Sequence, residues 1–311
     1  MAKHSSHQVR KKTELASIVI EEHFGIAPKK ISHKPTGLTN LVYEISLPDQ
    51  ELIVRISNDP TKYDDFLKEQ WAVTKVKKVG VPVAEILEVG NKIISKPYMI
   101  QQKIDGIIGD HCNDRLKIIN QMGAYTALIN SVETSNYGGT FDWSKNKLSR
   151  NETWLEYLQN ELQVKKCINI LKKNKMLSPS KLKALESNLR KIEEWNFKPV
   201  LNHGDMRLKN VIVNDAAKII AILDWELCNS NIAPYWDLCF ALHDLGIDEK
   251  QEFLKGYQLP PKKFEEMSAA IKVFNVLHYA LEMDKPDQKK GKDLLEEYRL
   301  RLNGCYDLYS F

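Results

Sequence analysis

The sequence predicts an α+β protein of two lobes, a small β-rich lobe followed by a larger helical one. Short runs of β-branched and aromatic residues crowd between residues 31 and 102, whereas helical periodicity and capping signals dominate after Gly106. The length of 311 residues allows two or three folding units, at roughly 100–200 residues each. We therefore expect a flexible N-terminal tail over 1–12, a first lobe over 13–102 and a second lobe over 103–311.

In the first lobe the clearest predicted element is a β-hairpin. Residues 41–47 and 51–56 are rich in Leu, Tyr and β-branched side chains, and a short polar turn that begins with Pro48 separates them. A helix over 64–79 follows, because the Gly80 directly after it is a stop signal. The remaining elements expected here are a helix over 13–24 and short strands at 85–89, 92–94 and 98–102.

The second lobe carries the signals of several helices around one hairpin. Asp114 can cap a helix whose apolar face includes Leu116 and Ile119. Ser178 followed by Pro179 opens another helix, with a capping side chain and a proline at the first helical position. The predicted elements are helices from 114, over 151–173, from 178 and from 235 onward, and a hairpin of strands 211–213 and 219–223.

Composition excludes several classes of protein. Hydrophobic residues make up 43% and charged residues 28% of the chain, which is typical of globular domains and not of disordered or collagen-like chains. No apolar run reaches the roughly 18 residues of a membrane span, and the polar start MAKHSSHQVRKK does not resemble a signal peptide. The five cysteines are scattered without a CxxC pair, so we expect reduced thiols and a cytoplasmic protein.

The charge of the chain gives little support for a macromolecular partner. The net charge of +4 is too small to indicate nucleic acid, and we expect neither a nucleic-acid nor a membrane partner. Residues 1–199 hold 31 basic and 23 acidic groups, a net +8, while residues 200–311 hold 14 and 18, a net −4. A polyanion could bind the first part and a cation the second, and ordinary variation in composition explains the difference equally well.

One segment combines the residues that phosphoryl transfer needs. Asp205 and Asn210 belong to the loop sequence HGDMRLKN, and Asp224 ends the return strand of the predicted hairpin, which should bring it back beside Asn210. An amide oxygen and a carboxylate suit Mg²⁺, which fills its remaining positions with water and phosphate. The other carboxylate could accept the proton of an attacking hydroxyl. The combination indicates phosphoryl transfer, which depends on positioning and on charge neutralisation.

HGDMRLKN followed by ILDWE resembles the catalytic signature of the aminoglycoside phosphotransferase and choline kinase superfamily. The members of this superfamily are small-molecule kinases with a protein-kinase-like fold. The resemblance implies that Asp205 is the catalytic base and that Asn210 and Asp224 bind Mg²⁺ on the phosphates of ATP. It covers about residues 31–260 and implies a nucleotide-binding first lobe and a second lobe that carries catalysis and binds the acceptor.

The resemblance also points to residues around the nucleotide. Arg55 stands where kinases carry a Lys on the α- and β-phosphates, and Glu69 on the next helix is placed to pair with it. Arginine is a departure, but its planar charged fork suits phosphate oxygens. The segment 98–106 resembles the interlobe hinge, whose backbone would bind adenine. The residues implied at the nucleotide are Gly37, Thr39, Asn40, Arg55, Glu69, Gln102 and Lys103.

Some alternatives stay open for each of these residues and for the activity. An ordinary turn at 36–40, which lacks a GxGxxG pattern, and solvated charges at Arg55 and Glu69 are the structural alternatives. A protein kinase shares the signature, but the stretch 224–237 is too short for a segment that presents a peptide. A catalytically silent nucleotide-binding scaffold would be expected to lack one of the three signature residues, and all three are present.

The predicted acceptor is a small hydroxylated molecule of undecided class. The acidic part 200–311, together with Trp225, Tyr235, Trp236 and Phe240, suits a cationic aminoglycoside or amino-alcohol, although these aromatic residues also fit a protein core. The patterns HGDxRLxN and DWEL with Arg55 resemble phosphotransferase domains associated with hydroxyacyl substrates. Within PYWDL, Asp237 resembles a structural element of the superfamily that supports the catalytic loop. The oligomeric state is not predicted.

Overall fold

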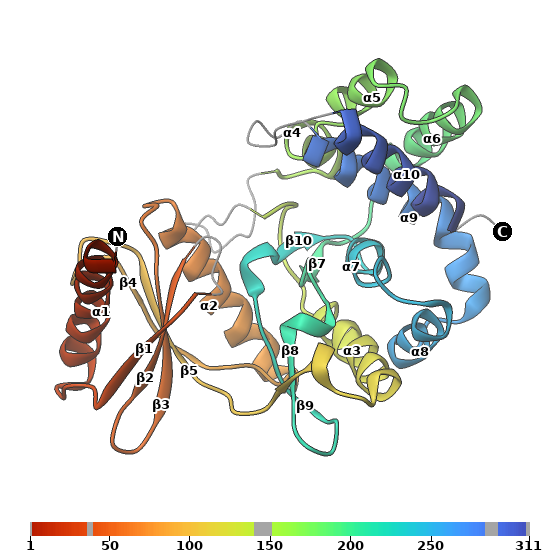
Figure 1. Ribbon diagram of the computed structural model, residues 1–311. Helices are drawn as coiled ribbons and strands as arrows, with labels where there is room; N and C mark the ends of the chain where they lie inside the picture. The colour runs from red at the N-terminus through yellow and green to blue at the C-terminus, as the bar shows by residue number, and fades with distance from the viewer. Residues whose placement is uncertain (1, 36–39, 140–150, 284–291, 309–311) are drawn as a thin grey trace. The chain divides into compact units, whose positions relative to one another are not determined.

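The computed structural model describes residues 2–35, 40–139, 151–283 and 292–308 (Figure 1). The chain divides into two compact units, of which unit 1 comprises Met1–Ile108 and Val211–Glu226, and unit 2 comprises Gly109–Asn210 and Leu227–Phe311. A β-rich N-terminal sheet and a helical C-terminal part confirm the predicted α+β fold class. The units differ from the predicted lobes in that the hairpin after residue 210 groups with the N-terminal sheet.

The centre of unit 1 is a five-stranded antiparallel sheet with the order β1-β2-β3-β5-β4. Its strands are β1 (Lys30–Lys34), β2 (Leu41–Ser46), β3 (Glu51–Ile56), β4 (Ile86–Gly90) and β5 (Tyr98–Gln102). The predicted hairpin of β2 and β3 is confirmed, and its turn closes with Leu47 N–H donating to the carbonyl of Gln50 at 2.9 Å. The strand predicted at 92–94 is wrong, because that segment consists of bends.

Helices cover both faces of this sheet (Figure 1). On one face, Val19 and Ile20 of helix α1 (Ala2–Phe24) share a buried apolar cluster with Tyr43 and Val54. Helix α2 (Lys62–Lys78) packs against β4 and β5. Helix α1 begins at Ala2, well before residue 13, where the sequence predicted a helix to start. The first turns, residues 2–12, are mostly polar, so they lack the apolar periodicity by which a helix is recognised in a sequence, although the Lys, Arg and Gln residues among them are good helix formers.

A second, smaller sheet in unit 1 contains the predicted hairpin. Strands β6 (Ile107–Ile108), β8 (Val211–Val213) and β9 (Ile219–Ile222) lie in the order β6-β8-β9. Ile222 N–H donates to the carbonyl of Pro82 at 2.9 Å, which ties the hairpin to the segment after α2. Strand β6 was not predicted, because two residues are too few to show an alternating pattern.

Unit 2 is built from helices and one small sheet (Figure 1). Its helices are α3 (Arg115–Ile129), α4 (Trp154–Asn160), α5 (Val164–Lys173), α6 (Pro179–Glu193), α7 (Tyr235–Ala241), α8 (Ile247–Tyr257), α9 (Pro261–Met283) and α10 (Lys292–Leu308). Ser178 caps α6 as predicted, accepting a hydrogen bond from Lys181 N–H at 3.3 Å. The single helix predicted over 151–173 is wrong, since the chain breaks between α4 and α5 at Gln163, where φ is +46°. No described helix combines the length and apolar character that crossing a membrane requires.

Candidate active site

The predicted catalytic loop leaves a short strand in unit 2. Strand β7 (Val200–Asn202) pairs with β10 (Asn229–Asn231), and the chain then turns sharply at Gly204, where φ is +79°. A Cβ atom at this position would lie 2.3 Å from the carbonyl oxygen of Leu227. The turn therefore needs glycine for two reasons, the left-handed backbone and the close approach of a neighbouring carbonyl.

A buried carboxylate holds this turn in place. Asp237, in the first turn of α7, is fully buried and accepts Gly204 N–H at 2.8 Å, His203 N–H at 3.1 Å and the Asn130 amide at 2.9 Å. Tyr257 O–H donates to Asn130 Oδ1 at 2.9 Å and extends the network to α8. Burial raises the pKa of Asp237, although these donors and the nearby His203 oppose the rise. Asp237 thus supports the loop directly, in agreement with its expected structural role.

Asp205 follows the turn and is surrounded by cations and donors. Its side chain lies 2.7 Å from Arg207 Nε as an ion pair, 3.0 Å from Lys209 Nζ and 2.9 Å from Asn210 Nδ2. Burial raises the pKa of Asp205, but Arg207, Lys209 and Asn210 outweigh burial and leave it below the ordinary value. The His203 ring accepts Asp205 N–H at 3.2 Å, so His203 helps to hold the loop. Asp205 is therefore an ionised carboxylate, the state that a general base requires.

Asn210 is oriented by the same carboxylate. It ends the short helical turn η3 (Leu208–Asn210), and its Nδ2 donates to both the backbone carbonyl and the carboxylate of Asp205, at 2.8 Å and 2.9 Å. Because the amide nitrogen is turned to Asp205, the amide oxygen is the atom of Asn210 that can bind a cation.

In unit 1, strand alternation places Arg55 on the face opposite α1. Its neighbours Val54 and Ile56 belong to the buried cluster with α1, while Arg55 turns toward α2. Arg55 Nη1 lies 2.7 Å from Glu69 Oε2, and the guanidinium lies over the Phe66 ring at 5.1 Å. The side chains of Arg55 and Glu69 are only 13% and 3% exposed, so the ion pair predicted from the sequence is present and nearly buried.

Three carboxylates act together on Arg55. Burial would lower its pKa, but the charges of Glu69, Asp224 and Glu226 raise it above the ordinary value, so the guanidinium stays charged. Burial raises the pKa of Glu69, and Arg55 opposes that rise. Asp224 follows β9 with φ at +62°, a backbone conformation that few residues other than glycine adopt. The structure thus brings together Arg55, Glu69 and Asp224 within unit 1.

Two residues of this group were not singled out from the sequence. Glu226 Oε2 lies 3.8 Å from Arg55 Nη2, and its Oε1 lies 2.5 Å from Nζ of Lys62 at the start of α2. Lys62 also pairs with Asp65 at 2.9 Å. Glu226 stands in the DWE motif, which was the available signal, whereas Lys62 belongs to no motif and is found only from the tertiary structure.

The structure describes only some of the other residues that were predicted to bind the nucleotide. Gly37 and Thr39 lie outside the described residues. Asn40 is buried, and its Oδ1 has no hydrogen-bond partner in the described part of the chain. Gln102 N–H donates to Glu85 at 2.8 Å and Lys103 N–H to Glu51 at 3.1 Å. These two amide hydrogens are therefore already used within unit 1, and an adenine ring would need other groups of the segment.

Metal ligands are few in both units. Among the described residues, no three His, Cys, Asp or Glu side chains form a group that could hold a metal ion. Asp205 and Asn210 lie in unit 2 and Asp224 in unit 1, so the predicted convergence of all three stays a prediction.

A comparison with protein families finds that the model of the phosphotransferase enzyme family matches residues 32–262. The chain belongs to the phosphotransferase enzyme family. Family membership confirms the activity predicted from HGDMRLKN, an ATP-dependent phosphotransferase that acts on small molecules. The match covers the catalytic loop, the Arg55–Glu69 pair and the hairpin, and it ends near the start of α9.

Solved structures of phosphotransferases share the fold of this family member. The aminoglycoside phosphotransferase APH(4)-Ia is 15% identical with a TM-score of 0.71, over 96% of this chain and all (100%) of the other. ADP-bound APH(2'')-Ib is 15% identical with a TM-score of 0.63, over 93% and 98% of the two chains. A putative fructosamine-3-kinase from Haemophilus somnus 129PT is 15% identical with a TM-score of 0.61, over 93% and 96%. No curated protein matches the chain in sequence.

Proposed function

We propose that this phosphotransferase moves the γ-phosphoryl group of ATP to a hydroxyl group of a small molecule, with Asp205 as the general base. The observation that carries the proposal is a buried, ionised carboxylate held by Arg207, Lys209 and Asn210 on a loop fixed by Asp237. The acceptor hydroxyl loses its proton to Asp205 as its oxygen bonds to the γ-phosphorus. The bond between that phosphorus and the bridging oxygen breaks, and ADP leaves with that oxygen.

Asn210 and Asp224 are the proposed Mg²⁺ ligands. The donor set fits a hard cation, because Asp224 supplies a carboxylate and the amide oxygen of Asn210 is the atom turned from Asp205. A bound Mg²⁺ would neutralise charge on the ATP phosphates. The contribution of the chain is to hold each ligand still, Asn210 through Asp205 and Asp224 through the constrained backbone after β9.

Arg55 is the proposed phosphate contact of unit 1. Its charge is maintained by Glu69, and Glu226 anchored by Lys62 limits where the guanidinium can turn. The loop with Gly37, Thr39 and Asn40 and the segment with Gln102 and Lys103 are proposed to bind the rest of the nucleotide. In that segment the backbone carbonyls are better candidates than the two amide hydrogens already donated within the sheet.

The proposed acceptor is a small hydroxylated molecule that binds in unit 2. Two solved relatives concern such molecules, since one structure of APH(4)-Ia contains hygromycin B and another relative is a putative fructosamine-3-kinase. The acidic balance of residues 200–311 favours an aminoglycoside or amino-alcohol, and a hydroxyacyl acceptor is the alternative. We expect the enzyme to act in the cytoplasm, in keeping with the free thiols of Cys112, Cys167, Cys228 and Cys239.

Acceptor-dependent consumption of ATP by the purified protein tests this function. The assay uses a panel of hydroxylated small molecules, with a peptide mixture as the competing substrate class. We expect ADP release and a phosphorylated small molecule by mass spectrometry, and both should disappear in Asp205→Asn. Phosphorylation of peptides alone, or turnover that survives in Asp205→Asn, would contradict the proposal.

A further inference from the structure

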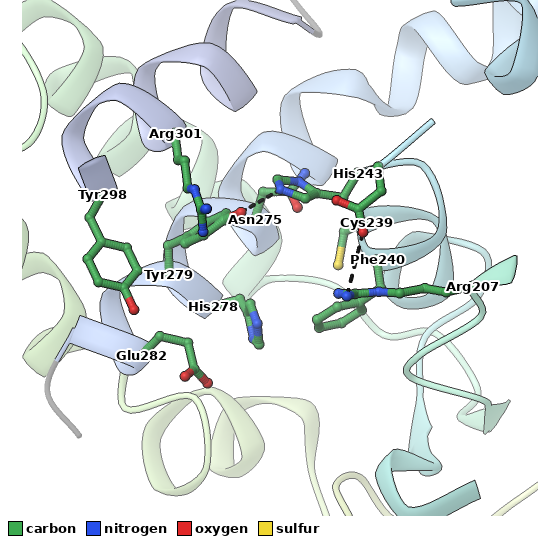
Figure 2. Close-up of a pocket in the computed structure, with 11 residues that line it drawn as sticks. Arg207, Cys239, Phe240, His243, Asn275, His278, Tyr279, Glu282, Tyr298 and Arg301 are labelled. Atoms are coloured by element: carbon green, nitrogen blue, oxygen red, sulfur yellow. Dashed lines mark hydrogen bonds and ion pairs between the residues drawn. The ribbon is translucent and has the colours of Figure 1, made fainter. Parts of the chain in front are cut away.

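A cavity of about 420 Å³ lies beside the catalytic loop inside unit 2 (Figure 2). It is formed by α7 and the segment after it, by α9 and by α10, and Arg207 of the catalytic loop also lines it. Arg207 forms the link to the proposed base, because its Nε lies 2.7 Å from Asp205 and its Nη1 lies 3.5 Å from Asp244. A cavity of this size suits a small-molecule ligand.

The charges in the lining are balanced. The cavity is lined by two arginines, Arg207 and Arg301, and two carboxylates, Asp244 and Glu282. Arg207 is paired with Asp244, and Arg301 lies 2.6 Å from Glu297 on its own helix. The two arginines would therefore repel a polycation, and the two carboxylates would repel a polyanion. The net −4 of residues 200–311 is a property of the segment and is not repeated in the lining of this cavity.

The histidine next to Arg207 adds a neutral polar group. His243 is hydrogen-bonded to the hydroxyl of Tyr279, and Figure 2 shows the two side chains meeting across the cavity wall. Burial lowers the pKa of His243, and the charges of Arg207 and Arg301 lower it further against the opposing Asp244. The imidazole is therefore neutral at pH 7 and offers hydrogen bonds without charge.

Aromatic rings contribute to the remaining wall. The Phe240 and His278 rings lie 4.7 Å apart, and the Tyr279 and Tyr298 rings 6.2 Å apart. The negative face of an aromatic ring attracts the weakly positive C–H groups on the flat side of a sugar or cyclitol ring. A lining that combines aromatic rings with polar groups suits a ring that carries several hydroxyl groups.

One donor in the lining lacks a partner. Asn275 of α9 is only 4% exposed, and its Nδ2 has no hydrogen-bond partner among the described residues. A buried donor without a protein partner is costly, so this amide is available to a water molecule or to a ligand oxygen in the cavity. The last torsion of an asparagine side chain is broad, which allows this amide to turn toward a ligand oxygen in the cavity that Asn275 lines.

We propose that this cavity is the acceptor site and that it binds an uncharged polyhydroxylated ring, a sugar or cyclic polyol, with Asn275 donating to one of its oxygens. The identification as an acceptor site rests on the proposed function. Most of the lining, including Asn275, His278, Tyr279 and Arg301, lies beyond residue 262, where the family match ends. Family membership therefore leaves the acceptor open, and the lining favours a neutral ring over the amine that the acidic segment suggested.

Direct binding to the full chain, with AMP-PNP and Mg²⁺ present, tests the inference separately from catalysis. The neutral probes are ribose, glucose and myo-inositol, the amine probes are kanamycin and choline, and the anionic probes are glycerate and 3-hydroxybutyrate. Binding is measured by saturation-transfer NMR and titration for the wild type, for Asn275→Leu and for Asn303→Leu. The last is the matched control, because Asn303 of α10 makes its hydrogen bonds to Met176 and Arg299 outside the cavity lining.

We expect a neutral probe to bind best and Asn275→Leu to raise its Kd about tenfold, the scale of one lost hydrogen bond. Asn303→Leu should leave that Kd unchanged. The inference is overturned if no neutral probe binds, if a charged probe binds best, or if both variants behave alike. A neutral probe that binds by way of Asn275 and is not phosphorylated when ATP replaces AMP-PNP would overturn the identification of the cavity as the acceptor site. The proposed function itself fails only if no small molecule of the acceptor panel is phosphorylated.

Discussion

Asp205 is held as a carboxylate by its immediate neighbours. A carboxyl group that is only 7% exposed would ordinarily favour its neutral form, but Arg207 and Lys209 supply two positive charges within 3.0 Å. The same two cations lower the basicity of Asp205, because they stabilise its charged form.

The first prediction concerns this residue. Asp205→Asn should lower kcat by about a hundredfold or more, because an amide cannot accept the hydroxyl proton. The Kd for Mg²⁺-ATP should change little, as Asn210 and Asp224 remain. Steady-state kinetics and nucleotide titration measure the two quantities. Asp215→Asn is the control, an exposed aspartate on the turn after β8, and near-wild-type turnover in Asp205→Asn would remove Asp205 from the mechanism.

A second prediction concerns the ion pair of unit 1. Glu69→Ala should lower the free energy of unfolding by about 3 kcal/mol, because it leaves the nearly buried Arg55 without its main partner. Glu85→Ala breaks a pair of similar length, 3.0 Å to Lys77, whose side chains are 58% and 56% exposed, and should cost at most about 1 kcal/mol. Urea unfolding measures both, and equal losses would contradict the argument.

The Glu69→Ala variant also tests whether Arg55 contacts the ATP phosphates, separately from its effect on stability. Without Glu69, the guanidinium of Arg55 can move toward Glu226, which lies 3.8 Å away. We expect the KM for ATP to rise in Glu69→Ala and to stay unchanged in Glu85→Ala. If the KM is unchanged in both, Arg55 does not hold the phosphates in the way proposed.

At the scale of elements, local sequence signals predicted the helices and hairpins that a few neighbouring residues determine. They missed the features that depend on contacts between residues far apart in the sequence. The β2–β3 hairpin, the cap at Ser178 and the β8–β9 hairpin follow from turn chemistry and alternation, which a few neighbouring residues determine. The break between α4 and α5 was missed because Gln163 is an unlikely residue for a positive φ. The grouping of the β8–β9 hairpin with unit 1 depends on a contact with Pro82, far away in the sequence.

The residues of the candidate site likewise divide into those that a sequence signature predicted and those that only the tertiary structure reveals. Motif spacing predicted Asp205, Asn210 and Asp224, and the resemblance to the superfamily implied the Arg55–Glu69 pair, with arginine in place of a lysine. Lys62, which meets Glu226 across 164 residues of sequence, has no such signature. The acceptor cavity was not predicted either, since its walls come from three helices whose facing side chains cannot be read from one-dimensional periodicity.

A third prediction concerns the turn between β7 and η3. Gly204→Ala combines a strained φ of +79° with a Cβ 2.3 Å from a backbone carbonyl, and should cost about 2–4 kcal/mol in unfolding free energy. Gly80→Ala is the matched control, because φ there is +87° and no described atom lies within 4 Å of the added Cβ. It should cost about 1–2 kcal/mol and leave turnover intact.

Turnover separates the two glycine variants most clearly. A displaced backbone at Gly204 moves the N–H groups that Asp237 accepts and the position of Asp205 one residue later. Gly204→Ala should therefore lose most of its kcat even at temperatures where it is fully folded by circular dichroism. Equal stability and equal turnover in the two variants would show that the close approach to Leu227 is unimportant.

At the scale of the whole molecule, the described structure combines a shared catalytic part with a part outside the family match. The match to the phosphotransferase family ends at residue 262, so it includes the loop with Asp205 and the pair of Arg55 and Glu69. Helix α10 and nearly all of α9 lie beyond it and supply most of the cavity wall. Under the proposed assignment of the cavity as the acceptor site, substitutions in α9 should change the KM for the acceptor without changing that for ATP.

The last prediction uses the stability of the whole chain to test the metal ligands. A ligand that binds only the folded state at 100 times its Kd stabilises it by about 2.7 kcal/mol, which in a chain of this size raises Tm by about 4–6 °C. ATP with Mg²⁺ should give such a shift, and ATP with EDTA a smaller one. Asp224→Ala should respond equally to both, because the metal-dependent increment requires that carboxylate, whereas Asp205→Asn should keep the full increment. Asp215→Ala controls for the loss of an acidic group on the neighbouring turn. If Asp224→Ala retains the difference between Mg²⁺ and EDTA and also turns over the acceptor, Asp224 is not a metal ligand.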